Sequence, residues 1–269
     1  MESGLGTYVT YNPFAVSPET RVEELQQLVE RLSMDHFPVV DGDQQLVGVV
    51  SDTDLILDAR NRMRSDGVTS PGNSTTVKDI FTGNLVTVDH SASPRQALNL
   101  LLDDYIHSLP VLDNGKLVGI VTTGDFLREF SYGQMTCAKE PVSDFLQPPP
   151  EPLDPDTTAD EALAALKSRR SDYLAVVQGG CPIGIVSGRE ILRLIAMKGS
   201  ERNLTGSSSI LKFLHKTPAF RPGQRMNEAA ALMVEHGLSA LAVSNQANRF
   251  LGIITADEIL KVMLDGLKP

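Results

Sequence analysis

Tryptophan is absent from this chain of 269 residues, which has only two cysteines and 5% aromatic residues. The cysteines, Cys137 and Cys181, form no CxxC pair, so the sequence indicates neither a zinc site nor a disulfide framework. No two of the five histidines have the spacing of a helical or zinc-finger metal site. We therefore expect no metal held by the protein alone.

Long apolar runs are also missing, since no stretch approaches the roughly 20 residues that a membrane-spanning helix needs. The first six residues have neither the basic nor the apolar region of a secretory signal. Hydrophobic residues make up 41% of the chain and charged residues 22%, as in a soluble globular protein. We expect a cytoplasmic protein that does not bind membranes.

Basic runs are lacking too. The net charge is −10, and residues 1–140 carry 20 acidic against 10 basic side chains, whereas residues 141–269 carry 14 of each. A nucleic-acid-binding protein needs a basic face to neutralise phosphates. The composition therefore argues against DNA or RNA as a partner.

One short phrase is present four times: a glycine, two apolar residues, Ser or Thr, two variable residues, and Asp or Glu. Its glycines stand 71, 65 and 68 residues apart, which is a fixed-period repeat. A unit of about 65 residues has a marginal core of its own, so two paired modules fit the chain better than four independent domains. The four copies occupy residues 48–54, 119–125, 184–190 and 252–258.

The second copy shows most clearly how a unit is built. A short strand at residues 85–88 precedes a helix that Ser93 caps and Pro94 opens, and that runs to about residue 104. Strands at 109–113 and 116–121 are joined by Asn114-Gly115, a dipeptide typical of tight hairpins. Thr122 then caps a helix to about residue 130. The predicted order is β-α-β-β-α, an α/β (α+β) fold.

The other copies repeat this order. Thr20-x-x-Glu23 and Thr158-x-x-Glu161 predict capping boxes that open the first helix of copies one and three, the former running to about residue 33. A lead-in phrase comes before copies two, three and four, at residues 77–81, 142–146 and 210–214, whereas the first copy has no clear one.

These signals divide the chain into repeats at residues 1–64, 77–133, 142–198 and 208–266. Polar linkers separate them, at residues 65–76, 147–152 and 199–209, and the middle one contains three consecutive prolines. We expect this proline run to follow the join between two modules, residues 1–140 and 141–269.

The recurring phrase brings a hydroxyl group and a carboxylate to the start of a helix. First-turn N–H groups and the helix dipole favour an anion such as phosphate. The carboxylate can accept hydrogen bonds from the two hydroxyls of a ribose. The same residues also make an ordinary helix cap, and the sequence leaves both interpretations open.

The unit order, the lead-in phrase, the Leu109-Pro110-Val111 strand start and the recurring phrase resemble the cystathionine-β-synthase (CBS) domain over about 250 residues. The resemblance implies repeats paired by pseudo-two-fold symmetry into two Bateman modules, whose clefts in many members bind AMP, ADP, ATP, S-adenosylmethionine or dinucleotides. It implies that Ser51 and Thr122 face phosphate and that Asp54 and Asp125 hold ribose. The residues it places around the adenine are Ala15, Val16, Thr87 and Val88, with His36, Pro38, His107, Ser108 and Pro110 from the paired repeat.

The second pair of repeats departs from this pattern. Its acidic residues are Glu190 and Glu258, one methylene longer, and its strand starts at 173–176 and 241–243 lack proline and histidine. We expect the second module to be structural or vestigial. Its own candidate ligand-binding residues are Ser187, Glu190, Thr255 and Glu258.

Charge narrows the expected ligand. Asp52 stands beside the proposed phosphate position, where it disfavours several unpaired phosphates, although His36 and His107 would offset it. We therefore favour AMP, S-adenosylmethionine or Mg²⁺-bridged ATP over free ATP, and expect no obligatory cofactor.

Three functions remain to be weighed. A ligand sensor would change its conformation on binding and so act on a partner protein or a second copy of the chain. A structural or dimerisation scaffold would leave its clefts empty. An enzyme is disfavoured, because GxSxG, P-loop, GxGxxG and HExxH motifs are absent and the repeats take up nearly the whole chain. We predict no catalytic residues.

Overall fold

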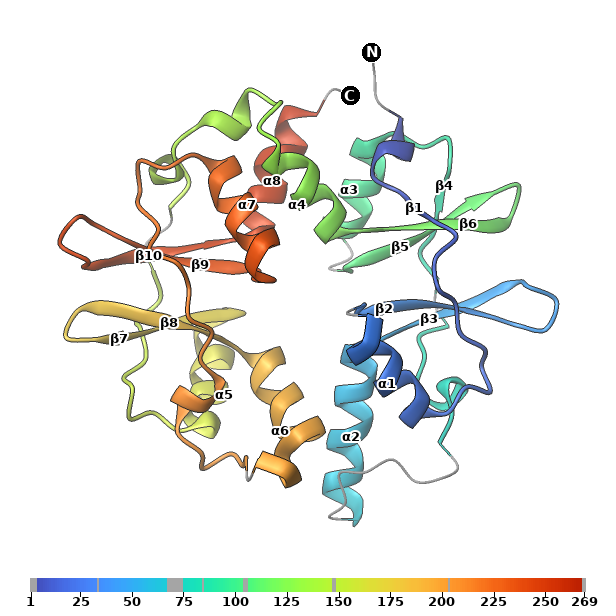
Figure 1. Cartoon of the computed structure of the whole chain (residues 1–269), viewed down its shortest axis with the longest axis horizontal. Helices are drawn as coiled ribbons and strands as arrows, with labels where there is room; N and C mark the ends of the chain where they lie inside the picture. Colours follow the sequence, from blue (N-terminus) through green and yellow to red (C-terminus); the bar gives the residue numbers. More distant parts are fainter. Residues whose placement is uncertain are drawn as a thin grey trace. The chain divides into compact units, whose positions relative to one another are not determined.

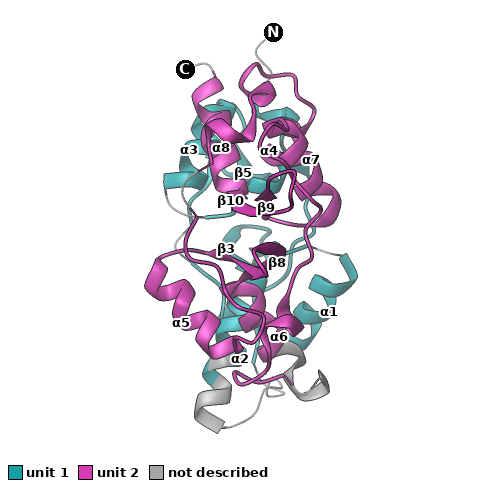
Figure 2. Cartoon of the chain, turned by 90° about the vertical axis from the view of Figure 1, so that its left-hand side faces the viewer, with its two compact units in different colours: residues 1–125 teal, residues 126–269 magenta. Residues whose placement is uncertain are grey.

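The computed structural model describes residues 4–32, 34–66, 75–83, 85–103, 106–146, 149–202 and 204–267. The chain forms two compact units, residues 1–125 and 126–269, coloured separately in Figure 2. The expected helix ends at residues 33 and 104, most of the linker at 65–76, and Pro148 of the proline run lie outside the described residues.

The first unit contains the predicted element order twice (Figure 1). Its first copy comprises η1 (Leu5–Thr7), β1 (Thr10–Tyr11), α1 (Val22–Leu32), β2 (His36–Val40), β3 (Leu46–Ser51) and α2 (Asp52–Asp66). Its second copy comprises η2 (Val77–Asp79), β4 (Val88–Asp89), α3 (Pro94–Asp103), β5 (Ser108–Asp113), β6 (Lys116–Thr122) and the start of α4 (Thr123–Ser131).

The second unit repeats the order after the rest of α4 and η3 (Cys137–Lys139). Its third copy comprises η4 (Val142–Asp144), α5 (Ala159–Arg169), β7 (Tyr173–Gln178), β8 (Cys181–Ser187) and α6 (Gly188–Arg202). Its fourth comprises η5 (Ile210–Phe213), α7 (Met226–His236), β9 (Ala240–Ser244), β10 (Phe250–Thr255) and α8 (Ala256–Gly266). The mixed α+β architecture is as the sequence predicts.

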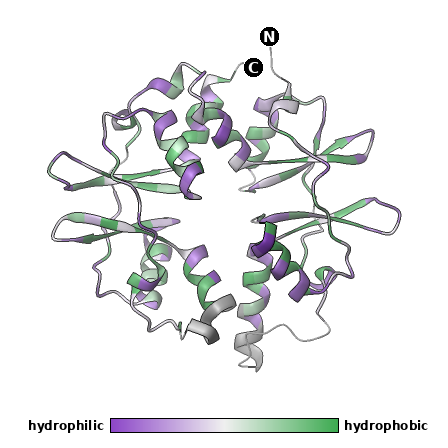
Figure 3. Cartoon of the chain, in the orientation of Figure 1, coloured by the Kyte–Doolittle hydropathy of each residue, from purple (hydrophilic) through white to green (hydrophobic). Residues whose placement is uncertain are grey.

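Each repeat is built on an antiparallel hairpin with one short parallel neighbour. In the second copy Val88 pairs with Val111 in parallel, and Asn114 and Gly115 take the positive φ values, 49° and 77°, that the hairpin turn requires. In the other copies the parallel neighbour is a single bridge, at Val16↔Val39, Leu153↔Val176 and Phe220↔Val243. Apolar residues concentrate on the strands, and hydrophilic residues lie at the hairpin tips (Figure 3).

The lead-in segments are exchanged between the two repeats of a unit. In unit 1, β1 lies at the start of the first repeat but pairs with β6 of the second repeat, with Tyr11 opposite Gly119 (Figure 1). Conversely, Thr82 follows η2 of the second repeat but pairs with Val49 of the first, through backbone bonds of 3.1 and 3.2 Å. In unit 2, His215 likewise pairs with Ile185 through two bonds of 2.9 Å. Neither repeat of a unit therefore has a complete sheet of its own.

This exchange explains the glycine that opens each recurring phrase. A Cβ atom on Gly48 would lie 2.0 Å from the Phe81 ring, and one on Gly119 would lie 2.3 Å from Val9 Cγ1. In unit 2, a Cβ atom on Gly184 would lie 2.5 Å from the His215 carbonyl oxygen, and one on Gly252 would lie 2.9 Å from Leu146. The glycines are needed because a lead-in from the other repeat crosses directly over them.

The start of the first repeat adds to and corrects the sequence analysis. A lead-in that the sequence does not show clearly is present, since Leu5 of η1 is buried and Val9 lies over Gly119. The predicted Thr20-x-x-Glu23 capping box does not form, since α1 begins at Val22 and the Thr20 hydroxyl accepts from the Ser17 N–H at 3.1 Å.

The caps predicted elsewhere are confirmed. In the third repeat, the Thr158 N–H and hydroxyl both donate to Glu161 at 2.8 Å. The Gln96 N–H donates to the Ser93 hydroxyl at 3.2 Å at the start of α3.

Buried apolar side chains fill each unit. Phe37, Val50 and Leu55 are fully buried in the first repeat. The third repeat has a core that includes Leu174 and Phe213, and a second cluster joins the two repeats of unit 2. This inter-repeat cluster consists of Ala175, Ile185, Ala240, Ala242 and Ile253.

Candidate functional site

The hydroxyl residue of each phrase ends a strand, and a helix begins at the next residue. Ser51 ends β3, Thr122 ends β6, Ser187 ends β8, and Thr255 ends β10. Across each hairpin, the first residue of the other strand lies opposite this hydroxyl: His36, Ser108, Tyr173 and Ala240 in turn. The sequence therefore located all four strand-to-helix junctions.

In three repeats the acidic residue caps its own helix. The Ser51 N–H and hydroxyl donate to Asp54 Oδ2, both at 2.7 Å. The Thr122 N–H and hydroxyl donate to Asp125 Oδ2 at 2.9 and 2.6 Å. Thr255 makes the same two bonds to Glu258 Oε2, at 2.8 and 3.1 Å. In each pair one carboxylate oxygen accepts both bonds.

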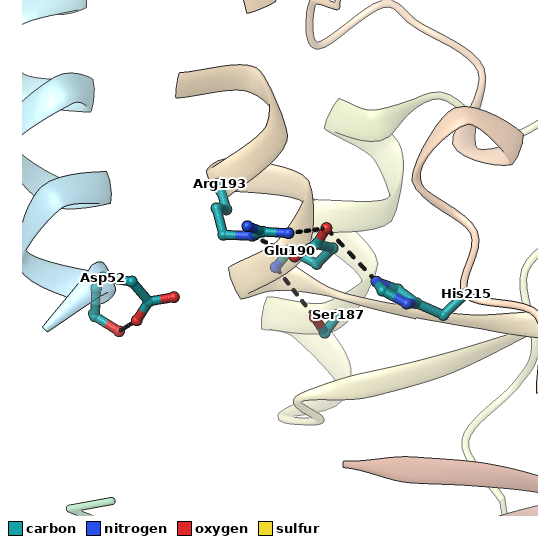
Figure 4. Close-up of polar contacts among 6 residues, drawn as sticks. Asp52, Ser187, Glu190, Arg193 and His215 are labelled. Carbon is teal, nitrogen blue, oxygen red and sulfur yellow. Dashed lines mark hydrogen bonds and ion pairs between the residues drawn. The ribbon is translucent and has the colours of Figure 1, made fainter. Parts of the chain in front are cut away.

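The third repeat differs (Figure 4). Its Glu190 N–H donates to the Ser187 hydroxyl at 3.1 Å, but the Glu190 carboxylate turns to two cationic side chains. Arg193 Nε and Nη2 donate to its two oxygens at 2.7 and 2.9 Å. His215 Nε2, from the lead-in of the fourth repeat, lies 3.7 Å from Glu190 Oε1. This carboxylate is held by a bidentate ion pair.

The acidity of these carboxyl groups follows from their partners. Burial raises the pKa of Asp54, as does the neighbouring Asp52 charge, while the hydrogen bonds from Ser51 act in the opposite direction. Burial also raises the pKa of Glu258. Burial acts on Glu190 too, but the interactions with His215 and Arg193 outweigh it and lower the pKa to about 2.

The residues expected around the adenine are next to the strand starts of unit 1. The Val16 N–H donates to the Pro38 carbonyl at 2.9 Å, which sets Ala15 and Val16 beside β2. The pairing of Val88 with Val111 sets Thr87 and Val88 beside Pro110 in the same way. The His36 and His107 rings, one from each repeat, lie 6.3 Å apart between centroids. The two strand starts of unit 1 thus meet.

Exposure separates these candidates. Val16, Val88, Ser108, Pro38 and Pro110 are buried. Those accessible to solvent, wholly or in part, are His36, His107, Ala15, Thr87, Ser51, Asp54, Thr122 and Asp125. Asp52, which the sequence set beside the phosphate position, is only 4% exposed, so its charge acts through the protein and not from the surface.

Unit 2 fills the corresponding position with a larger side chain. Tyr173 stands where the first repeat has His36, and it packs against the inter-repeat cluster. It hydrogen-bonds to Ser239 of the fourth repeat, and its burial raises the pKa of the phenol. This tyrosine links the two strand starts of unit 2.

Within the described residues, no group of three or more His, Cys, Asp or Glu side chains could hold a metal ion. The described helices include none that is long and apolar enough to cross a membrane.

Comparison with known proteins places these junctions in a family. The sequence profile of the CBS domain matches four segments, residues 5–61, 77–132, 142–197 and 213–265. The solved structure of protein MJ1225 from Methanocaldococcus jannaschii is similar over 96% of this chain and 99% of its own, with a TM-score of 0.74 and 19% identity. A conserved protein from Pyrococcus horikoshii has a TM-score of 0.66 and 21% identity over 97% of this chain and 100% of its own.

Curated relatives match shorter stretches. The inosine-5′-monophosphate dehydrogenase of Bifidobacterium longum is 31% identical over 137 residues, which are 50% of this chain and 23% of the enzyme. The chloroplastic CBS domain-containing protein CBSX1 of Arabidopsis thaliana is 32% identical over 136 residues, 42% of this chain and 57% of that protein. The chain therefore matches only 23% and 57% of the length of these two relatives. With four matched segments and a shared fold along its length, the chain belongs to the CBS domain family.

Proposed function

We propose that this protein is a regulatory sensor that binds an adenosine-containing ligand, mainly in unit 1. The observation that carries the proposal is the pair of hydroxyl–aspartate junctions of unit 1, Ser51 with Asp54 and Thr122 with Asp125. The strand starts beside them meet at His36 and His107. Many members of the family bind such ligands between paired repeats.

Helix capping does not prevent ribose binding. A carboxylate has two oxygens and about four acceptor positions. The bonds from Ser51 go to Asp54 Oδ2, so the ribose hydroxyls would donate to Oδ1. The Ser51 and Thr122 hydroxyls, at helix N-termini, would face the phosphate, where the helix dipole favours an anion.

Unit 2 takes a structural role in this proposal. Glu190 is committed to Arg193 and His215, and Tyr173 bridges its two strand starts. The ligand-binding module would be residues 1–140 and the structural module residues 141–269. Ligand binding would then bias a partner protein or a second copy of the chain through a change in unit 1.

Calorimetry with AMP, ADP, S-adenosylmethionine, and ATP with and without Mg²⁺ tests the proposal. We expect AMP, S-adenosylmethionine or Mg²⁺-ATP to bind better than free ATP, because the Asp52 and Asp54 charges disfavour unpaired phosphates. A ligand at 100 times its dissociation constant should also stabilise the fold by about 2.7 kcal/mol.

Asp54→Asn and Asp125→Asn identify the site. Asparagine keeps an oxygen for the helix cap but removes the charge, so binding should weaken by about 1.5–3 kcal/mol with little loss of stability. Glu258→Gln, which alters a cap in unit 2, is the matched control and should leave affinity unchanged. Unchanged affinity in the double variant would place the ligand elsewhere. No binding of any ligand would favour a scaffold in which these carboxylates only cap helices.

A further inference from the structure

A small pocket lies near the turn of the β5–β6 hairpin in unit 1 (Figure 1). Its volume is about 320 Å³, at the lower end of the range for ligand sites. Three chain segments contribute the residues that line it, which are Tyr11, Asn12, His90, Asp113, Leu117 and Val118. Val118 precedes Thr122 on β6 by four residues, which is about 13 Å along an extended strand. The pocket is therefore separate from the Thr122–Asp125 junction of the same repeat.

Two of the lining rings are joined. The Tyr11 hydroxyl and His90 Nε2 share a hydrogen bond of 2.9 Å, and the ring centroids are 6.0 Å apart with an interplanar angle of 52°. The lead-in of the first repeat brings Tyr11 there, because β1 pairs with β6. Tyr11 is 47% exposed, so part of its ring is open to solvent. A cation within about 6 Å of such a ring face is attracted by the quadrupole of the ring.

A carboxylate lines the same pocket. Asp113 Oδ1 accepts a hydrogen bond from Asn114 Nδ2 at 2.9 Å, and Oδ2 accepts none from the described residues. Asp41, the equivalent residue of the first repeat, instead accepts two backbone N–H groups of its own hairpin turn. Lys116 lies opposite Asp113 across the hairpin but does not line the pocket, and no ion pair joins the two within the described residues. The Asp113 carboxylate is thus available to a ligand.

The joined rings depart from the repeat pattern. Two residues after the parallel bridge, the second repeat has His90 and the other three have proline. These prolines are Pro18, Pro155 and Pro222. On the crossing lead-ins, the residue level with Tyr11 is Gly83 over the first repeat and Lys216 over the third. The repeat fold therefore does not require the Tyr11–His90 pair.

We propose that this pocket binds the ammonium group of a small organic cation, with the Asp113 carboxylate and the Tyr11 ring as its partners. Both groups attract an ammonium ion, and methyl groups on its nitrogen can pack against Leu117 and Val118. The surrounding charge also favours a cation, since residues 1–140 carry 20 acidic against 10 basic side chains. This site goes beyond the proposed function and requires no nucleotide.

An NMR titration with choline tests the site through the backbone amide signals of unit 1. Choline should shift the signals of Asn12, Asp113 and Leu117 saturably, because its head group would lie beside them. The uncharged alcohol in which a carbon atom replaces the choline nitrogen has the same shape and should cause no saturable shift there. Sodium chloride at the same concentration controls for ionic strength.

Substitutions identify the binding groups. Asp113→Asn removes the charge but keeps an oxygen for Asn114, and should weaken choline binding roughly twofold to fivefold. Tyr11→Leu keeps an apolar side chain without a ring face and should weaken binding by a similar factor. Lys116→Gln removes a like charge close to the site and should strengthen binding by up to about twofold. Asp43→Asn, at the hairpin turn of the first repeat, is the matched control and should leave the affinity unchanged.

The outcomes are decisive in both directions. Saturable binding of choline but not of its uncharged analogue, weakened by Asp113→Asn, supports the proposal. The proposal is overturned if choline causes no saturable shift at the pocket, if the analogue binds equally well, or if Asp113→Asn binds choline like the wild type. If Tyr11→Leu detaches the lead-in, Asp113→Asn decides alone, since Asp113 is exposed beside the hairpin turn.

Discussion

At the scale of single residues, the four junctions show how one distant side chain changes what a carboxylate does. Glu190 and Glu258 occupy equivalent positions, and each has a basic residue three positions later, Arg193 and Lys261. Glu258 nevertheless caps its helix while Glu190 pairs with Arg193. The third repeat also has His215 beside Glu190, brought there by the exchanged lead-in. Sequence spacing alone could not distinguish the two cases.

Stability should depend on pH through Glu190. Its pKa is lowered from 4.5 to about 2, so the folded state favours the ionised carboxylate. The ion pair should therefore contribute its full stability above about pH 4.5 and lose it as the pH falls toward 2. Urea unfolding of Glu190→Gln should show a loss of about 1–2 kcal/mol at pH 7, an amount reduced by solvent screening, and a smaller loss at pH 3.

Glu258→Gln is the control with the opposite sign. Burial raises the pKa of Glu258, so the wild-type carboxyl costs stability when ionised and this cost disappears as the pH falls. As the pH falls from 7 to 3, the stability of the wild type relative to the glutamine variant should therefore decrease at Glu190 and increase at Glu258. A Glu190→Gln difference that is the same at pH 7 and pH 3 would contradict the proposed ion-pair contribution.

At the scale of elements, the recurring glycines make room for the crossing lead-ins. Gly48→Ala should destabilise the protein by about 1–3 kcal/mol, because the added methyl group would overlap the Phe81 ring. Gly42→Ala, where a Cβ atom would meet nothing within 4 Å, should leave the thermal unfolding temperature nearly unchanged. Adding Phe81→Ala to Gly48→Ala should remove the overlap and make the two changes non-additive. If Gly48→Ala were as stable as Gly42→Ala, the lead-in would adjust to the added methyl group without a loss of stability.

Much of the fold could be predicted from the sequence because its signals are local. The Asn114-Gly115 turn, the Ser93 and Thr158 caps and the four junctions each depend on residues within one turn or hairpin. The lead-in exchange could not be predicted, since pairing between Thr82 and Val49 leaves no periodic pattern.

The start of α1 differs from its capping-box spacing for a local reason. The helix begins at Val22 because Arg21, not Thr20, provides the carbonyl that accepts the first helical bond, from the Leu25 N–H at 3.0 Å. At the site, the Ser51–Asp54 and Thr122–Asp125 pairs could be identified as local spacings. The contact of His215 with Glu190 could not, because it depends on the exchanged lead-in of the fourth repeat.

At the scale of the whole molecule, the exchanged lead-ins make the pair of repeats the smallest complete unit. Each repeat of unit 1 completes the sheet of the other, through β1 on β6 and through Thr82 on Val49. A single repeat of about 65 residues would also bury little apolar surface. We therefore infer that the two repeats of a unit depend on each other for stability.

Removing residues 1–11 tests this dependence across the chain. The deletion takes away η1 and β1, which begin the first repeat, and β1 pairs with β6 of the second. Hydrogen exchange should therefore accelerate in β6, around Gly119 and Ile120, more than in β3, although β3 is much nearer in sequence. Phe81→Ala gives the reciprocal control, since it removes the side chain that crosses Gly48 and should loosen β3 before β6. If the deletion instead exposed β3 first, sequence proximity and not lead-in exchange would govern the stability of each repeat.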